Sequence, residues 1–261
     1  MRGGAYPPTP ADAHALFDVG YENVFMWALG IETSNPAACA PAAGAVALAR
    51  LEGAALVRQD FEPVSPARPA EDDLVPAIDR LFRRAHAARR DLRRVCVSIG
   101  PGGFTAVRIA VAATKFIAEA TGAACVGVPT ALALSLSVRE PGPFAVALAS
   151  KGDTAHITRF LSPGVMAGPG TICSAADIPR LGVGLLVSDS HLPRSLFHAA
   201  SESGVRVIPP VFDAFCVLEA GQGLQPVDPA ELSLLYPREP EAVTKWRALH
   251  GKGPSSVSPL A

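Results

Sequence analysis

The sequence predicts an α/β protein with two successive lobes, each built on a mixed sheet. Three strand-like runs come first, and the short breaks between them favour antiparallel neighbours. Helices and strands then alternate in two sets, which is typical of layered α/β lobes. The chain has 261 residues, enough for two modest lobes that each bury a core.

The first set of elements is predicted to form the first lobe. We expect strands at 27–33, 44–51 and 54–59, a proline-rich loop at 62–70, a helix at 72–90, a strand at 95–99, a helix at 104–121 and a strand at 125–128. The helix at 72–90 follows from apolar residues that recur on one helical face, beginning with Leu74, Ile78 and Leu81. Acids at its start and arginines at its end match the helix dipole.

A second set of elements is predicted to form the second lobe. We expect a helix at 130–138, strands at 144–149, 154–160 and 184–188, a helix at 191–203, a strand at 205–208 and a helix at 211–220. The chain then divides into a disordered extension (1–26), a first lobe (27–131), a second lobe (132–238), and a C-terminal helix with a disordered tail (239–261). Met26 directly precedes the first strand and is an alternative translational start to Met1.

Composition limits the class of protein. Apolar residues make up 49% and charged residues 18%, as in an ordinary globular chain. The net charge of −1 argues against a surface that grips nucleic acid by itself. Five widely spaced cysteines favour reduced thiols in a cytoplasmic protein. No apolar run approaches eighteen residues, so we expect no membrane span.

The helix expected at 104–121 is apolar around most of its circumference. One stripe comprises Ile109, Ala113, Phe116 and Ala120, and another comprises Val107, Ala110, Val111, Thr114 and Ala118. A helix of this kind must be covered on more than one side. Its own sheet can cover one side, and either the rest of the chain or a partner protein covers the other.

A glycine-rich turn, Gly100-Pro101-Gly102-Gly103, opens this helix. Backbone N–H groups at a helix N-terminus favour anions. The turn has neither the lysine of a Walker A loop nor the G-x-G-x-x-G spacing of dinucleotide-binding folds. Taken alone, the turn is a weak signal for phosphate binding.

Motifs for catalysis and metal binding are missing from the sequence. None of the six histidines pairs at i, i+4, and no G-x-S-x-G occurs. We therefore predict no catalytic and no metal-binding residues. Seven arginines lie between Arg80 and Arg94, and we favour a solvated helix face over contact with RNA phosphates.

Three motifs resemble the TsaB (YeaZ) proteins of bacteria. They are LGIETSNPAA (29–38), SIGPGGFTAVRIAVAATKFIAEATGAACVGVPTALAL (98–134) and YPREPEAVTKW (236–246). The resemblance implies the actin/hexokinase/Hsp70-like (ASKHA) fold, with two ribonuclease-H-like lobes whose sheets each begin with three antiparallel strands. It implies a non-catalytic scaffold subunit, a pseudo-enzyme, that binds and stabilises TsaD. That complex transfers a threonylcarbamoyl group to the adenosine next to the anticodon of tRNAs reading codons that begin with adenine.

The resemblance also implies partners and sites. The expected partners are TsaD in a heterodimer, the ATPase TsaE, tRNA only within the complex, and a second copy of the chain when TsaD is missing. No cofactor is expected on this subunit, since ATP and metal belong to the partners. The partner interface is expected on helix faces that carry Leu81, Ala85, Ile109, Ala110, Val111, Ala113, Phe116 and Ile117. A nucleotide or loop site would comprise Glu32, Thr33, Ser34, Gly100, Gly102, Gly103, Thr105 and Arg108.

This sequence departs from the family pattern at the loops. Glu32 replaces the usual aspartate, Gly103 the usual serine, and Ala149-Ser150-Lys151 the usual D-A-R segment. These changes weaken the expectation of nucleotide chemistry. Three alternatives stay open: an ATP-dependent phosphotransferase of the sugar-kinase type, a glycoprotein endopeptidase, and direct tRNA binding through the arginine-rich segment.

Overall fold

Strand β1 lies in the middle of the first sheet. The computed structural model describes residues 25–65, 72–237, 246–247 and 249. Within them the first sheet has five strands in the order β3-β2-β1-β4-β5. Their bounds are β1 Met26–Glu32, β2 Ala45–Glu52, β3 Ala55–Pro63, β4 Leu92–Gly100 and β5 Ala124–Pro129. Strands β1, β2 and β3 pair antiparallel, and β4 and β5 continue parallel to β1. The prediction of three leading antiparallel strands is confirmed.

The second sheet follows a similar plan. Its order in the described residues is β11-β10-β6-β7-β8, and β9 also pairs with β7. The bounds are β6 Phe144–Ala149, β7 Ala155–Ser162, β8 Val165–Met166, β9 Thr171–Cys173, β10 Leu185–Ser188 and β11 Arg206–Ile208. Strands β6 and β7 are antiparallel, whereas β10 and β11 lie parallel to β6. Strands β8 and β9 were not predicted, because two or three residues carry too little periodicity.

The helix at 104–121 has the predicted bounds, whereas the other helices are shorter than the sequence pattern predicts. They are α2 Leu74–Arg84, α3 Phe104–Thr121, α4 Thr130–Ser135, α5 Arg194–Glu202 and α6 Ala214–Gln222, with 3₁₀ turns at Arg89–Asp91 and Ala175–Arg180. The predicted helix at 72–90 ends early because His86 adopts a positive φ of 50°, which a right-handed helix does not allow. Pro193 directly precedes α5, and its non-helical backbone marks the start of the helix at Arg194.

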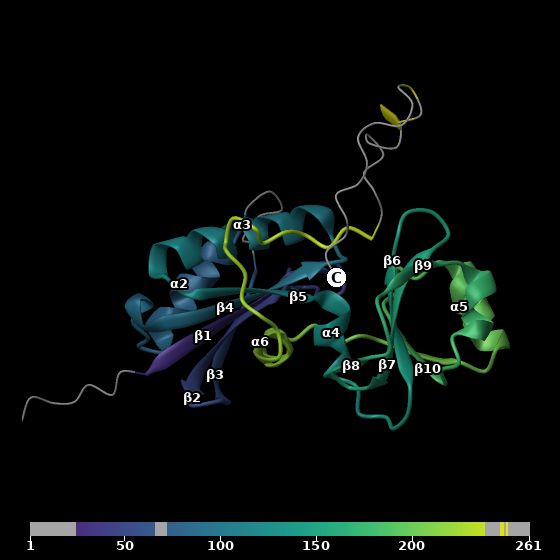
Figure 1. Cartoon of the computed structure of the whole chain (residues 1–261), viewed down its shortest axis with the longest axis horizontal. Helices are drawn as coiled ribbons and strands as arrows, with labels where there is room; N and C mark the ends of the chain where they lie inside the picture. The colour runs from purple at the N-terminus through teal and green to yellow at the C-terminus, as the bar shows by residue number, and fades with distance from the viewer. Residues whose placement is uncertain (1–24, 66–71, 238–245, 248, 250–261) are drawn as a thin grey trace, which may run out of the picture.

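The helices cover the first sheet on both faces. Figure 1 shows α2 and α3 on one face and α6 on the other. Leu29, Leu81 and Val107 belong to the core between the sheet and the α2–α3 layer. On the second sheet, α5 packs over the outer face with the core residues Ala145 and Leu196.

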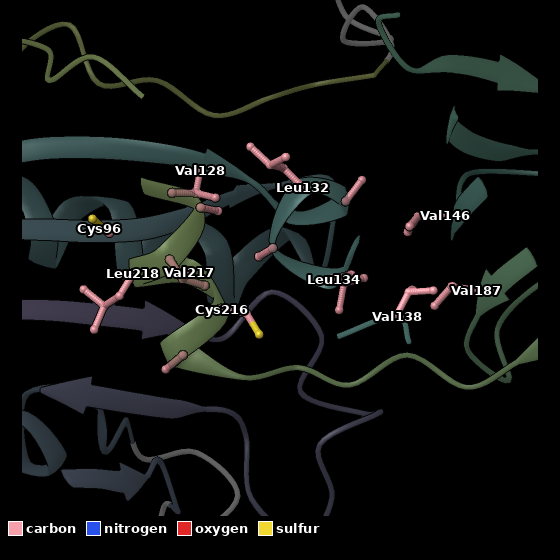
Figure 2. Close-up of a cluster of buried hydrophobic side chains, with 14 of the residues drawn as sticks. Cys96, Val128, Leu132, Leu134, Val138, Val146, Val187, Cys216, Val217 and Leu218 are labelled. Atoms are coloured by element: carbon pink, nitrogen blue, oxygen red, sulfur yellow. The ribbon is translucent and has the colours of Figure 1, made fainter. Parts of the chain in front are cut away.

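A shared core joins the two lobes. One cluster of buried side chains spans both lobes. Its members come from the face of the first sheet that α6 covers, from α4 and α6, and from the inner face of the second sheet. Figure 2 shows Leu134 and Val138 between Val217 of α6 and Val187 of the second sheet. The two lobes therefore share one apolar interior.

The second lobe is shorter than predicted. Helix α6 packs on β1, β2 and β4 of the first sheet. The chain after it, residues 224–237, also returns to the first lobe, since Val227 N–H donates to Cys125 O at 2.9 Å. The predicted second lobe, 132–238, is corrected accordingly, because residues 214–237 pack with the first lobe.

Some expectations lie outside the described residues. They are the extension at 1–24, most of the proline-rich loop, and most of the C-terminal segment 239–261. In the described ranges, no helix combines the length and the apolar character needed to cross a bilayer.

Candidate functional site

One face of α3 packs on its own sheet. Val107, Ala110, Val111, Thr114 and Ala118 are buried along it, and the helix contacts β4 and β5. Ala110 and Val111, which were predicted at the partner interface, therefore cannot reach a partner while the lobe is folded. This burial removes Ala110 and Val111 from the predicted partner interface.

The opposite face of α3 is open in the described part of the chain. Phe116 is 76% exposed and Ile109 is 37% exposed, although both side chains are large and apolar. Ala113 and Ile117 are half-buried beside them. Burial of apolar area on this face would be favourable by about 25 cal/mol per Å². These four residues of the predicted interface are available to a partner.

Helix α2 forms the opposite wall of the same surface. Leu81 is fully buried in the core of the first lobe, so it too is removed from the predicted interface. Ala85 is half-buried at the end of the helix. Val75 is 60% exposed at its start.

An apolar groove runs between these two helices, and we call it the α2–α3 groove. A first hollow of about 790 Å³ is lined mainly by Val75, Ile78, Phe82, Ala113, Phe116, Ile117 and Ala120. Leu29 and Leu92, from strands β1 and β4, also line it. A second hollow of about 450 Å³ lies nearer the start of both helices and is lined by Leu74, Phe104 and Ile109 among others. The groove exists because α2 packs on β2 and β3 whereas α3 packs on β4 and β5.

The other flank of α3 is covered by the C-terminal strap, residues 224–237 (Figure 1). Lys115 Nζ donates to Ala230 O at 3.1 Å, and Leu235 N–H donates to Ile99 O at 2.9 Å. Leu232 of the strap is buried in the core of the first lobe. The strap was not predicted, although its alternating leucines are typical of a partly buried extended segment.

Arg108 belongs to this strap contact. Its guanidinium carbon lies 3.7 Å from the centroid of the Phe104 ring. Its Nε and Nη2 both donate to Tyr236 Oη at 3.1 Å. Of the two roles predicted for Arg108, contact with a nucleotide has no support in this geometry, because the side chain is occupied by the strap.

The glycine turn is built for close approach of two loops. A Cβ on Gly102 would overlap Ser34 O, so only glycine fits there. Gly103 N–H donates to Ser34 O at 2.6 Å, which uses one of the N–H groups that an anion would need. Thr33 Oγ1 donates to Ala106 O at 3.5 Å. The structure brings residues 32–34 and 100–103 together, as predicted. The contacts between them hold the two loops against each other.

Glu32 is buried at the base of these loops and is only 1% exposed. Its carboxyl group accepts a hydrogen bond from Ser34 N–H at 2.7 Å and another from Ser98 Oγ. Burial raises the pKa of Glu32 above its ordinary value of 4.5, although the hydrogen bonds oppose the shift. Both carboxyl oxygens are already engaged by these hydrogen bonds, which leaves the group poorly placed to coordinate Mg²⁺.

Two arginines of the arginine-rich segment, Arg80 and Arg84, are neutralised by nearby carboxylates. Arg80 pairs with Glu62 and Asp73. Arg84 pairs with Asp60 and Glu62 on the edge strand β3. These pairs favour the interpretation of a solvated helix face over one of phosphate contact.

The described residues contain no group of three or more histidine, cysteine, aspartate or glutamate side chains placed to hold a metal ion. The cysteines in this part of the chain are all free thiols. Burial raises the pKa of the Cys96 thiol to about 12, so this thiol stays protonated at neutral pH.

Comparison with known proteins matches part of the chain to a family and most of it to a fold. Residues 61–162 match the family model of TsaD, the tRNA N6-adenosine threonylcarbamoyltransferase. These residues include α2, α3 and the whole α2–α3 groove except its floor residue Leu29 and the loop residues Thr33, Pro36 and Ala43. No curated protein matches the sequence significantly.

Two solved structures share the fold. One is a crystal structure of an uncharacterized protein with similarity to peptidase YEAZ from Pseudomonas aeruginosa, with 18% identity, a TM-score of 0.62, and coverage of 82% of this chain and 100% of that chain. The other is YeaZ from Pseudomonas aeruginosa, with 17% identity, a TM-score of 0.60, and coverage of 81% and 99%. The chain therefore shares the two-lobed α/β fold of these structures. The matches support the resemblance to TsaB (YeaZ) proteins that its motifs carry.

Proposed function

We propose that this chain is a TsaB-type accessory subunit in the threonylcarbamoylation of tRNA. Its role is to bind TsaD and stabilise the competent form of that enzyme, without catalysing the transfer itself. The observation that carries the proposal is the open apolar face of α3, which exposes Phe116 and Ile109 beside the α2–α3 groove. Exposed apolar surfaces of this kind mark protein interfaces.

The groove is supported as the docking surface by its position. It lies mainly in the segment that matches the TsaD family model. TsaD and this chain would thus present related helical layers to one another. Each would supply the apolar cover that the other lacks, since helices with small residues approach closely. A second copy of this chain competes for the same surface in the absence of TsaD.

The state of Glu32 supports an accessory role over a phosphotransferase. A sugar-kinase mechanism needs an ionised acid near the metal-bound phosphates. Here the carboxyl group is buried and bonded to Ser34 and Ser98. We propose accordingly that ATP and metal belong to TsaD and the ATPase TsaE, and that tRNA is bound only by the assembled complex in the cytoplasm. Steady ATP hydrolysis by the purified chain alone would revive the phosphotransferase.

Affinity for purified TsaD tests the proposal. Phe116→Glu places a charge in the proposed contact without disturbing the core, because the native ring is 76% exposed. We expect its Kd for TsaD to rise at least about 30-fold, because central apolar contacts contribute about 2 kcal/mol or more. Isothermal titration calorimetry gives the Kd directly.

Phe197→Glu is the matched control. Phe197 is 55% exposed on α5 of the second lobe, far from the groove in the fold. Its substitution should leave the Kd within about twofold of wild type, since surface changes away from an interface have small effects. Equal weakening by both variants, or failure of the wild type to bind TsaD, would contradict the proposal.

A further inference from the structure

The α2–α3 groove has a direction. Leu74 and Phe104, which begin α2 and α3, both line the second hollow. Phe82 and Ile117, which lie near the ends of the two helices, both line the first hollow. The two helices are therefore parallel, and their C-terminal ends meet at one end of the groove.

The charges at the two ends of the groove differ. Arg83 and Arg89 line the end where α2 and α3 finish. Both pair with the single carboxylate of Asp79, so the three side chains together carry one excess positive charge. The arginine side chains are 79% and 74% exposed. At the opposite end, the exposed carboxylate of Asp72 lines the groove.

A helix seated in this groove would meet two sets of charges. The C-terminal ends of α2 and α3 carry partial negative charge and favour the positive N-terminal end of another helix. The guanidinium groups of Arg83 and Arg89 favour carboxylates at the same place. A helix whose first turn carries aspartate or glutamate satisfies both, because acids are favoured in first turns.

We infer that the groove selects one apolar-faced helix of the partner, which runs antiparallel to α2 and α3 and places an acidic first turn against Arg83 and Arg89. This inference rests on the proposed function and adds the orientation and charge of the bound helix. Two small residues of α3, Ala113 and Ala120, line the groove. They allow the bound partner helix to lie close to the floor of the groove.

Photo-crosslinking to purified TsaD tests the orientation. A benzophenone amino acid replaces Ala120 at one end of α3 or Thr105 at the other, and both positions are exposed. The two positions are fifteen residues apart in the helix, which separates the probes by about 22 Å. Mass spectrometry then maps the crosslinked residues of TsaD. We expect both sets on one helix, with those captured from position 120 preceding those captured from position 105.

Charge reversal tests the acidic first turn. The double variant Arg83→Glu, Arg89→Glu should weaken TsaD binding about tenfold at low salt, and added salt should reduce the difference. Arg206→Glu is the control, because Arg206 is also exposed and paired with one carboxylate, Glu140, but lies in the second lobe. It should change the Kd less than twofold.

The outcomes separate this inference from the proposed function. Crosslinks in the reverse order, crosslinks on two different helices, or a double variant that binds as well as wild type would overturn the inference and leave the TsaD-binding role intact. If TsaD does not bind the wild-type chain, the proposed function fails and the inference fails with it.

Discussion

The hydroxyl oxygen of Tyr236 accepts two hydrogen bonds of 3.1 Å from the guanidinium group of Arg108, which joins the C-terminal strap to α3. Strap and helix are separated by more than a hundred residues in the chain. The strap thus covers one flank of α3 while the other flank stays open to the groove. An attached strap leaves the groove as the accessible apolar side of this helix in the described residues.

Loss of the Arg108 side chain should loosen the strap. Arg108→Ala removes two hydrogen bonds to Tyr236 and the contact with the Phe104 ring. We expect the free energy of unfolding to fall by about 1–2 kcal/mol, as measured by urea denaturation. Limited proteolysis should cut within 224–237 faster than in the wild type. Unchanged proteolysis would show that the strap is held by its other contacts alone.

Gly102→Ala should destabilise the first lobe. The added Cβ would overlap Ser34 O, and the two loops can separate only by breaking the Gly103–Ser34 hydrogen bond. We expect a loss of about 1–3 kcal/mol in thermal or urea unfolding. Gly168→Ala is the control, because its Cβ would meet no atom within 4 Å. A neutral Gly102→Ala would contradict the structural role of this glycine.

Glu32→Gln should stabilise the protein at neutral pH. The folded-state pKa of Glu32 is raised by burial above the ordinary value of 4.5. The folded state therefore keeps a proton that the unfolded state loses, and stability falls as the pH rises from 4.5 through the folded pKa. Glutamine is neutral and avoids this loss. Urea unfolding at pH 4 and pH 7.5 should give nearly equal stabilities at pH 4 and a more stable variant at pH 7.5.

A less stable Glu32→Gln variant at pH 7.5 would have the opposite meaning. It would indicate that Glu32 is ionised in the folded protein and is stabilised there by the hydrogen bonds from Ser34 and Ser98. The argument against a metal–phosphate site at these loops would then fail.

His156 should make the second lobe sensitive to acid. Its ring is buried on β7, and burial lowers its pKa below the ordinary value of 6.5. The unfolded state therefore takes up a proton first, and stability is lost as the pH falls below 6.5 towards the folded pKa, by at most about 1.4 kcal/mol per pH unit. His156→Gln should flatten this part of the pH profile. An identical slope in wild type and variant would show that a group other than His156 causes this pH dependence.

The fold was accessible from the sequence because its signals are local. Strand alternation, the apolar spacing from Leu74 to Phe82 and the glycine turn at 100–103 each depend on residues close together in the chain. Helix ends were less accessible, since the positive φ of His86 has no clear signature in a non-glycine residue. The order βββ-α-β-α-β was confirmed for the first lobe.

Only part of the candidate site could be predicted from the sequence, because long-range packing determines which side chains stay exposed. The pattern identified two stripes on α3 but could not tell which one faces the sheet. The structure buries the stripe with Ala110 and opens the stripe with Ala113. Arg108 was predicted at a loop or nucleotide, and its partner Tyr236 lies 128 residues away. No local spacing reports a contact of that kind.

Co-purification with TsaD of two variants, in which an alanine of α3 is replaced by a charged residue, tests the central claim most directly. Ala110 is buried against the sheet, so Ala110→Arg should destabilise the isolated chain by about 3–5 kcal/mol, as measured by circular dichroism. Ala113 lies in the groove, so Ala113→Glu should unfold like the wild type in isolation yet fail to retain TsaD. A folded Ala113→Glu chain that still co-purifies with TsaD at the wild-type ratio would contradict the account.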